Sequence, residues 1–206
     1  AGIWSTHFIA MLGYRPEASV NLNVDKTALS ALIIMCGSLV GCYLATLKFA
    51  LARTLAGAVI GLSVTAMHYV GMMAYHLDAI VTWDLRYVAA SIVLAVFFSA
   101  LAFESAQPHS KGFKRFVPGL WLAAGVVTLH FTGMGAMTVI GLSVSEGLDP
   151  VTFQILALTT AVTSLIVIGA GAAGYAVEAS LRERTDRRLR HLALHDLVTD
   201  LPHRAC

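Results

Sequence analysis

The chain of 206 residues is 57% hydrophobic and only 13% charged, and its formal net charge at pH 7 is +2. Its mean hydropathy of +0.74 lies outside the range of ordinary soluble domains. These values exclude a soluble globular domain. They predict a protein of the lipid bilayer, with no nucleic-acid partner.

Runs of residues without charge predict the helices in chain order. Residues 1–14 are apolar but too short to cross a bilayer, so we expect the second half of a helix that begins before this sequence. Five longer runs follow, at residues 27–47, 55–77, 87–103, 116–144 and 151–177. A span needs about 20 residues, and Glu104 and Ser105 complete the third run. The predicted fold class is an all-α, polytopic transmembrane helix bundle of five full helices plus one truncated helix.

The distribution of basic residues orients this bundle. Alternate loops share one side of the membrane, and the set that includes the tail after residue 178 holds most of the Lys and Arg residues. These are Lys48, Arg53, Lys111, Lys114, Arg115, Arg182, Arg184, Arg187, Arg188 and Arg190. The positive-inside rule makes this set cytoplasmic. We therefore expect a multi-pass protein with its C-terminus inside and its 145–150 loop outside.

A short pattern occurs three times inside these helices, as THFIAM at residues 6–11, MHYVGM at 67–72 and LHFTGM at 129–134. Its histidines are spaced by 61 and then 62 residues, which indicates a repeated unit. Since positions i and i+4 share a helix face, each copy presents an imidazole beside a thioether. The residues concerned are His7, Met11, His68, Met72, His130 and Met134.

The predicted topology brings the three copies to a similar depth. Each repeat holds two crossings, so all three helices that carry the motif run outward. The histidines lie 7, 9 and 12 residues before the expected outer helix ends at Tyr14, Leu77 and Leu142, or about 10–18 Å at 1.5 Å per residue. A bundle that packs these helices together would converge the imidazoles in the outer half of the membrane.

Imidazole and thioether groups without a carboxylate form a ligand set for a soft metal ion. This set disfavours Mg²⁺, Ca²⁺ and Mn²⁺ and suits copper, above all Cu(I); haem with axial His or Met ligands is the less favoured cofactor. Small residues at i+3, namely Ala10, Gly71 and Gly133, would let the helices pack closely beside the ligands. The alternative is that the histidines are polar contacts between helices and the methionines are core filler. Three matching copies favour the ligand site.

The triple motif, with MHYV at residues 67–70, resembles the MHYT domain of bacterial membrane signalling proteins. The resemblance covers residues 1–178, without the family's first helix and part of the second. It implies seven transmembrane helices in the intact domain, motifs near the outer face of the bacterial inner membrane, and sensing of O₂, CO or NO through copper. Thr6 and Leu129 stand where the motif has Met, and Ala10 where it has Gly. The implied metal ligands are His7, Met11, His68, Met72, His130 and Met134, with Met67 as an auxiliary ligand.

The end of the sequence carries a second, shorter resemblance. Residues 191–205, HLALHDLVTDLPHRA, are similar to the opening of GGDEF diguanylate cyclase domains, typically HDxLTGLPNR, with Val198, Asp200 and His203 as departures. We therefore expect an MHYT domain at 1–178, a cytoplasmic linker helix at 179–194 and the start of a GGDEF-like domain at 195–206. An ordinary amphipathic tail is the alternative.

Together these patterns predict the sensor module of a bacterial cyclic di-GMP signalling protein. We expect the chain itself to be no enzyme, because it ends before a nucleotide site, and the full-length protein to be a diguanylate cyclase, a cyclic di-GMP phosphodiesterase or both. The expected partners are the bilayer, a diatomic gas, the downstream cyclase domain and a second copy in a homodimer. The alternative is a copper- or haem-binding membrane protein without a signalling output.

Overall fold

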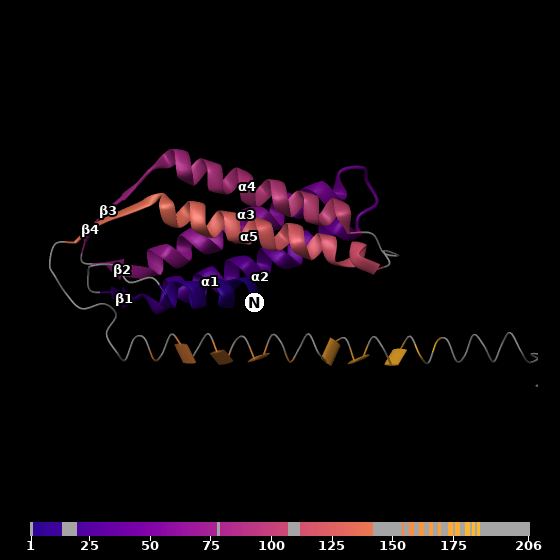
Figure 1. Ribbon diagram of the computed structural model, residues 1–206. Coiled ribbons are helices and arrows are strands. Elements are labelled where there is room, and N and C mark those ends of the chain that lie inside the picture. The colour runs from indigo at the N-terminus through magenta and orange to yellow at the C-terminus, as the bar shows by residue number, and fades with distance from the viewer. Residues whose placement is uncertain are drawn as a thin grey trace, which may run out of the picture. The chain divides into compact units, whose positions relative to one another are not determined.

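A computed structural model describes residues 2–13, 20–77, 79–106 and 112–141, together with isolated positions between 154 and 185. The chain divides into two units, Ala1–Thr163 and Ser164–Cys206. The described helices of the first unit lie side by side in a bundle (Figure 1). They are α1 (Gly2–Leu12), α2 (Val24–Thr46), α3 (Ala52–Ala74), α4 (Leu85–Ser105) and α5 (Val117–Gly135), with a short 3₁₀ helix, η1 (Gly112–Phe116), before α5.

Four of the described helices, α2 to α5, are long and apolar enough to cross a membrane. Each coincides with one of the predicted apolar runs, and α4 reaches Ser105 as its span requires. In lipid, a helix satisfies its own backbone hydrogen bonds, so such runs fold as helices. The predicted all-α polytopic bundle is therefore confirmed, and α1 is an 11-residue helix. Apart from isolated positions, the predicted span at 151–177 and the helix at 179–194 lie outside the described residues.

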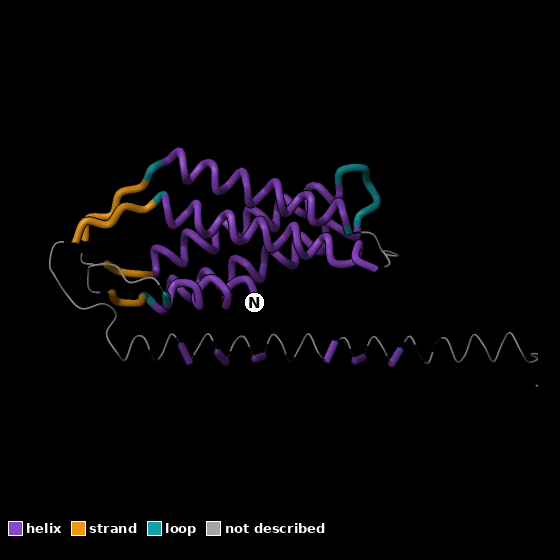
Figure 2. Tube along the Cα trace, viewed as in Figure 1, coloured by secondary structure: helices purple, strands orange, loops and turns teal. Residues whose placement is uncertain are grey.

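Short strands lie together at one end of the bundle (Figure 2). β1 (Val20–Leu22) pairs antiparallel with β2 (Tyr75–Leu77), and β3 (Ala79–Trp83) pairs antiparallel with β4 (Met137–Gly141). The sequence analysis extended helices through these segments, to residues 77 and 142, which is wrong. The segments AIVTW and MTVIG are rich in β-branched residues, which favour strands, and their pairing satisfies the backbone groups outside the helices.

The two strand pairs are copies of one arrangement. Asn23 begins α2 and Asp84 begins α4, and each side chain accepts a hydrogen bond from a backbone N–H of the first helical turn. The backbone N–H of Asn23 bonds to the carbonyl of Ala74 at 2.8 Å, and that of Asp84 bonds to the carbonyl of Ala136 at 2.9 Å. Asn23 and Asp84 are 61 positions apart, like the first two motif histidines. The sequence repeat is therefore also a structural repeat.

Helix α3 lies at the centre of the described bundle and packs against α1, α2, α4 and α5. Two of its glycines let the backbone of α4 approach closely. A Cβ atom at Gly57 would lie 2.6 Å from Cα of Ala100, and one at Gly61 would lie 2.7 Å from Cα of Val96. This is the small-residue packing common between membrane helices, and it fixes α3 against α4.

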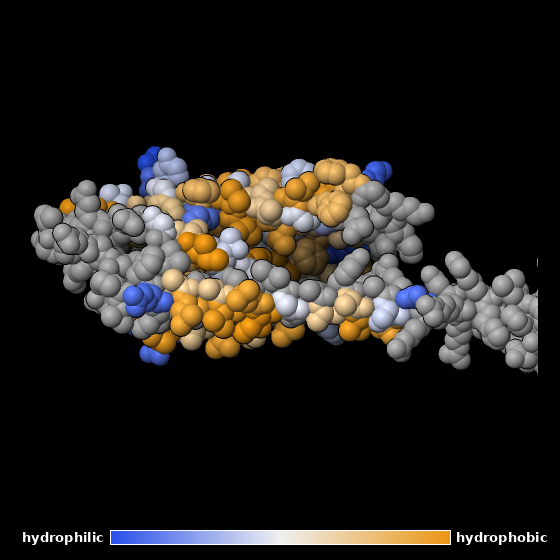
Figure 3. Space-filling view, turned by 60° about the horizontal axis from the view of Figure 1, so that its bottom comes forward, coloured by the Kyte–Doolittle hydropathy of each residue, from blue (hydrophilic) through white to orange (hydrophobic). Residues whose placement is uncertain are grey.

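The surface of the bundle is apolar along its length. Figure 3 shows large hydrophobic areas on the flank, with hydrophilic side chains mainly toward the ends. Leu39 and Val93, for example, are 72% and 65% exposed. Such large exposed apolar areas are unfavourable in water and favourable in lipid. The described part of the chain is accordingly a multi-pass membrane domain.

Candidate metal site

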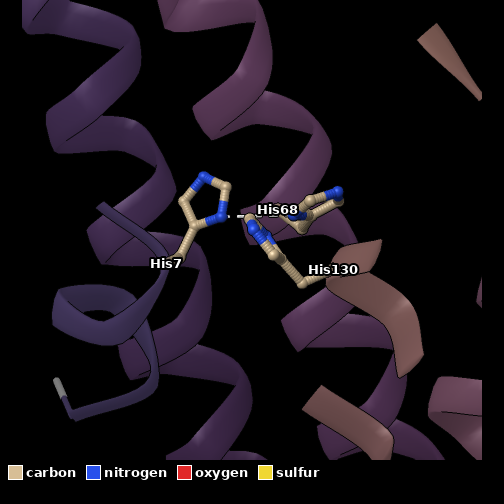
Figure 4. Close-up of side chains that lie close together, drawn as sticks. All are labelled: His7, His68 and His130. Atoms are coloured by element: carbon tan, nitrogen blue, oxygen red, sulfur yellow. Dashed lines mark hydrogen bonds between the residues drawn. The ribbon is translucent and has the colours of Figure 1, made fainter. Parts of the chain in front are cut away.

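The structure brings the three motif histidines together. His7 of α1, His68 of α3 and His130 of α5 point toward one another (Figure 4). Their ring centres are 4.9 Å apart for His7 and His68, 5.4 Å for His68 and His130, and 5.6 Å for His7 and His130. Each ring offers one nitrogen, and these three nitrogens lie within 4.8 Å of one another. The convergence that the sequence analysis assumed is present.

The histidines occupy equivalent places on their helices, close to the end that carries the strands. They precede the last helical residues Leu12, Ala74 and Gly135 by 5, 6 and 5 positions, or about 8–9 Å at 1.5 Å per residue. The sequence analysis placed them deeper and less evenly, because it extended the helices into the strands. The three histidines therefore lie at similar positions along their helices, and these positions are more even than predicted, while their place in the outer half of the membrane stays a prediction.

The hydrogen bonds of the three imidazoles are incomplete. Nδ1 of His7 and Nδ1 of His68 are 3.2 Å apart, so one must donate to the other. Nε2 of His7, Nε2 of His68 and Nδ1 of His130 are buried and have no hydrogen-bond partner within the described residues. A buried nitrogen without a partner is unfavourable and requires an explanation. A first-row metal ion lies about 2.0–2.1 Å from each ligand nitrogen and holds those nitrogens about 3.4 Å apart. One nitrogen from each ring already lies within 4.8 Å of the others, so the three imidazoles fit a bound cation after ring movements.

Burial differs among the three rings. His7 is 5% and His68 is 2% exposed, whereas His130 is only half-buried. The two buried rings are also the pair joined by a hydrogen bond. The site therefore consists of a close pair and a third, less enclosed imidazole.

An apolar cavity of about 140 Å³ adjoins the histidines between α1, α3 and α5. Besides the three imidazoles it is lined mainly by hydrophobic side chains, including Ile3, Val64, Val126 and Phe131. Thr6 is the one other polar side chain among the described lining residues. The histidines thus face a small, mainly apolar space.

The methionines of the motif take different places. Met67, the predicted auxiliary ligand, lines the cavity together with the three histidines. Met11 and Met72 are buried and Met134 is half-buried, but none of these three is among the residues that line the cavity. Met11 and Met67 belong to the apolar core, and Met134 packs against it.

Two serines that the sequence analysis missed anchor the helices of the site. The indole Nε1 of Trp4 in α1 donates to Oγ of Ser30 in α2 at 3.0 Å. The hydroxyl of Tyr69, next to His68 in α3, is hydrogen-bonded to Oγ of Ser91 in α4 at 2.7 Å. Ser30 and Ser91 are 61 positions apart, so applying the period of the motif to the returning helices would have identified them.

Comparison with known families identifies the repeat. The profile of the MHYT family, described as a bacterial signalling protein N-terminal repeat, matches residues 1–58, 61–119 and 124–193. The chain belongs to the MHYT family. Each MHYT repeat contains one of the three site histidines, and the third match extends past residue 178, where the sequence analysis ended the domain.

Several curated relatives share the MHYT region. The chain is 33% identical over 94% of its length to an uncharacterised signalling protein of Caulobacter vibrioides. It is 31% identical over 98% of its length to the cyclic di-GMP phosphodiesterase NbdA of Pseudomonas aeruginosa. It is 29% identical over 98% of its length to the bifunctional diguanylate cyclase/cyclic di-GMP phosphodiesterase MucR of the same organism. The chain spans 24%, 27% and 32% of the lengths of these relatives, respectively. No solved structure matches it significantly.

Proposed function

We propose that this MHYT chain is the sensor domain of a membrane signalling protein and that His7, His68 and His130 hold a copper ion. The observation that carries the proposal is the convergence of three imidazoles from three repeats, with buried nitrogens that lack a partner in the described part of the chain. If the histidines were only polar contacts between helices, they would have to pair with one another, and the only such bond among the described residues joins His7 and His68. A bound cation would instead use one nitrogen from each ring, taken from the three that lie within 4.8 Å of one another.

The donor set supports copper over harder metals. No carboxylate is found among the described residues that line the cavity, whereas three imidazoles and the thioether of Met67 are. Neutral imidazole with thioether suits Cu(I). We further propose thioether ligands from the motif positions i+4, which are Met11, Met72 and Met134. Copper held there would supply a redox-active centre with an exchangeable coordination position.

The packing of the rings supports a single ion over haem. The imidazoles meet edge to face with centres 4.9–5.6 Å apart. Haem requires a slot for its planar macrocycle between or beside its axial ligands, and rings packed this closely leave none between them.

We propose that a diatomic gas, O₂, CO or NO, is the stimulus. The cavity beside the histidines is small and apolar, which suits such a molecule. Because the histidines join α1, α3 and α5, a change at the site would alter the packing of these helices. The chain after residue 178 would then carry the change to a cytoplasmic output domain.

The relatives support a cyclic di-GMP enzyme as that output. NbdA is named as a cyclic di-GMP phosphodiesterase and MucR as a bifunctional cyclase and phosphodiesterase. We propose that this chain has no cyclase activity of its own and that the GGDEF-like residues 195–206 begin such a domain. A copper carrier without a signalling output is less well supported, because the relatives are named as signalling proteins and enzymes.

We also propose that the strand end of the bundle faces the periplasm and that the C-terminus is cytoplasmic. The asymmetry of Lys and Arg between alternate loops supports this orientation. Reporter fusions at residues 107–110 and at residue 147 should give cytoplasmic and periplasmic signals, respectively. Identical signals would refute the orientation.

The direct test of the site is the copper content of histidine variants. Wild-type protein, His7→Ala, His68→Ala, His130→Ala and the paired variants are purified, and copper and zinc per protein are measured. Each single replacement should remove most of the copper and a second should remove little more, because ligands of one ion are non-additive. His109→Ala, a histidine outside the motifs, is the control. Wild-type copper at background, or single variants that retain it, would refute the metal site.

A further inference from the structure

Two glycines of the motif lie directly against the imidazoles of other motif copies. A Cβ atom at Gly71 in α3 would lie 2.7 Å from Nε2 and 3.1 Å from Cδ2 of His7 in α1. A Cβ atom at Gly133 in α5 would lie closer still to Nε2 of His68 in α3, and 3.0 Å from its Cδ2. Both imidazoles therefore meet the backbone of the next motif helix with the same ring edge. The absence of a side chain at Gly71 and Gly133 makes this approach possible.

We propose that Gly71 and Gly133 are positioning residues of the site, each seating the imidazole of the preceding motif copy. The repeats then interlock in order: His7 is held by the second copy and His68 by the third. This inference rests on the proposed metal site for its consequence, but the interlocking itself is a property of the metal-free protein. It assigns to the glycine of the motif a role beyond close packing of helices.

The other glycines of α3 show that this role is distinct. Gly57 and Gly61 in the same helix face backbone atoms of α4, and a side chain there would push two helices apart. Gly71 faces a ring, and a side chain there would displace that ring while the helix backbones have no direct clash among the nearest atoms. Replacement of Gly71 should therefore disturb His7 first.

Ala10 is the residue of the first copy that corresponds to Gly71 and Gly133. Ala10 has a methyl group where the other two copies have only hydrogen, and Ala10 and His130 both line the cavity. His130 is the half-buried ring, and its centre is 5.4 and 5.6 Å from the others, against 4.9 Å within the close pair. His130, whose ring lies farther from the other two, is thus the imidazole for which the motif supplies no glycine seat.

The first test measures copper binding by Gly71→Ala and Gly133→Ala. Purified protein is titrated with copper against a competing chelator, and the EPR spectrum of the oxidised complex reports the ligand geometry. Each variant should bind copper about 10–100-fold more weakly, as when groups that orient ligands are changed, with an altered spectrum. Gly135→Ala is the matched control, two residues from Gly133 in α5 with nothing within 4 Å of its Cβ position, and should match the wild type. Unchanged affinity and spectrum in both seat variants would overturn the proposal.

The second test uses metal-free protein and identifies which ring each glycine seats. Gly71→Ala should lower the Tm in the wild type and have little effect once His7→Ala has removed the ring, whereas His68→Ala should not relieve it. Gly133→Ala should show the opposite pairing, with relief by His68→Ala alone. Relief without this pairing, or no relief, would overturn the proposal. If the pairing holds while wild-type protein binds no copper, the seats stand and the metal site fails.

Discussion

The contact between α1 and α3 and the contact between α3 and α5 are built alike, whereas the contact that would close the circuit is different. In the first two, an imidazole lies against a motif glycine, Gly71 or Gly133. At the third, Ala10 replaces glycine, and Ala10 and His130 both line the cavity. Three copies that are nearly equivalent in sequence are therefore unequal in space. The difference divides the site into a close pair, His7 and His68, and a third, less enclosed imidazole, His130.

The most direct test of this difference is to remove one imidazole of the close pair and, separately, the third imidazole. His68→Ala should weaken copper binding about tenfold more than His130→Ala, a difference of about 1.4 kcal/mol, because His68 alone is hydrogen-bonded to His7 and seated on Gly133. Competition with a chelator of known affinity measures the two losses. Equal losses would show that the three imidazoles are equivalent ligands.

The anchors of the close pair provide a second comparison. Ser30→Ala and Ser91→Ala should each lower the free energy of unfolding by about 1–2 kcal/mol, because Trp4 and Tyr69 each lose a hydrogen-bond partner. Chemical unfolding in detergent measures the change. Ser63→Ala is the control, since the hydroxyl of Ser63, like those of Ser30 and Ser91, donates to a carbonyl of its own helix, but it has no hydrogen bond to another helix among the described residues. Losses no larger than that of the control would show that these bonds do not anchor the helices.

A third test introduces a glycine at position 10, so that all three motif copies have one. Ala10→Gly should strengthen copper binding a few-fold by allowing His130 a closer approach, although a glycine within α1 lowers helix stability by about 1 kcal/mol. The gain should vanish in Ala10→Gly/His130→Ala, and Ala123→Gly, at an exposed position of α5, should show none. A chelator titration of the four proteins decides the matter. Weaker binding by Ala10→Gly would contradict the assignment.

The smallest expected effect distinguishes the equivalent helix caps Asn23 and Asp84. Hydrogen bonds from Arg86, first from its side chain and then from its backbone, lower the pKa of Asp84 below its usual value. A lowered pKa in the folded state means that the charged carboxylate stabilises the fold above the ordinary pKa of about 4 and that this contribution is lost as pH falls through the folded value. Thermal unfolding from pH 7 to pH 2 should show a small decrease that Asp84→Asn removes. Since the side chain of Asp84 is 34% exposed and that of its partner Arg86 is 90% exposed, an unchanged slope in Asp84→Asn would show that solvent screens the interaction.

Much of the architecture could be predicted from the sequence because the bilayer allows few solutions. A charge-free run of about 20 residues has to satisfy its backbone internally, so α2, α3, α4 and α5 appeared where expected. The strands at Ala79–Trp83 and Met137–Gly141 were missed. Hydrophobicity alone does not distinguish a helix from a strand in a short apolar segment at the end of a span. Their β-branched residues were the available signal.

The histidines of the site could be predicted, but their inequality could not. Residue type, spacing and direction identified His7, His68 and His130 as a set at one depth, because helical periodicity and the membrane together restrict where a repeated polar residue can lie. The assignment of Met11, Met72 and Met134 as ligands stays a prediction.

The sequence by itself determined the membrane-spanning fold and the three imidazoles. The fold follows from local hydrophobicity, and the imidazoles follow from a repeat that is visible in the sequence alone. Only the tertiary structure decided which helices meet and which ring lies on which glycine. Those contacts join residues more than 60 positions apart, such as His7 with Gly71 and His68 with Gly133. Whether a glycine admits a helix backbone, as at Gly61, or an imidazole, as at Gly71, depends on what the packed bundle places opposite it. No local pattern contains that information.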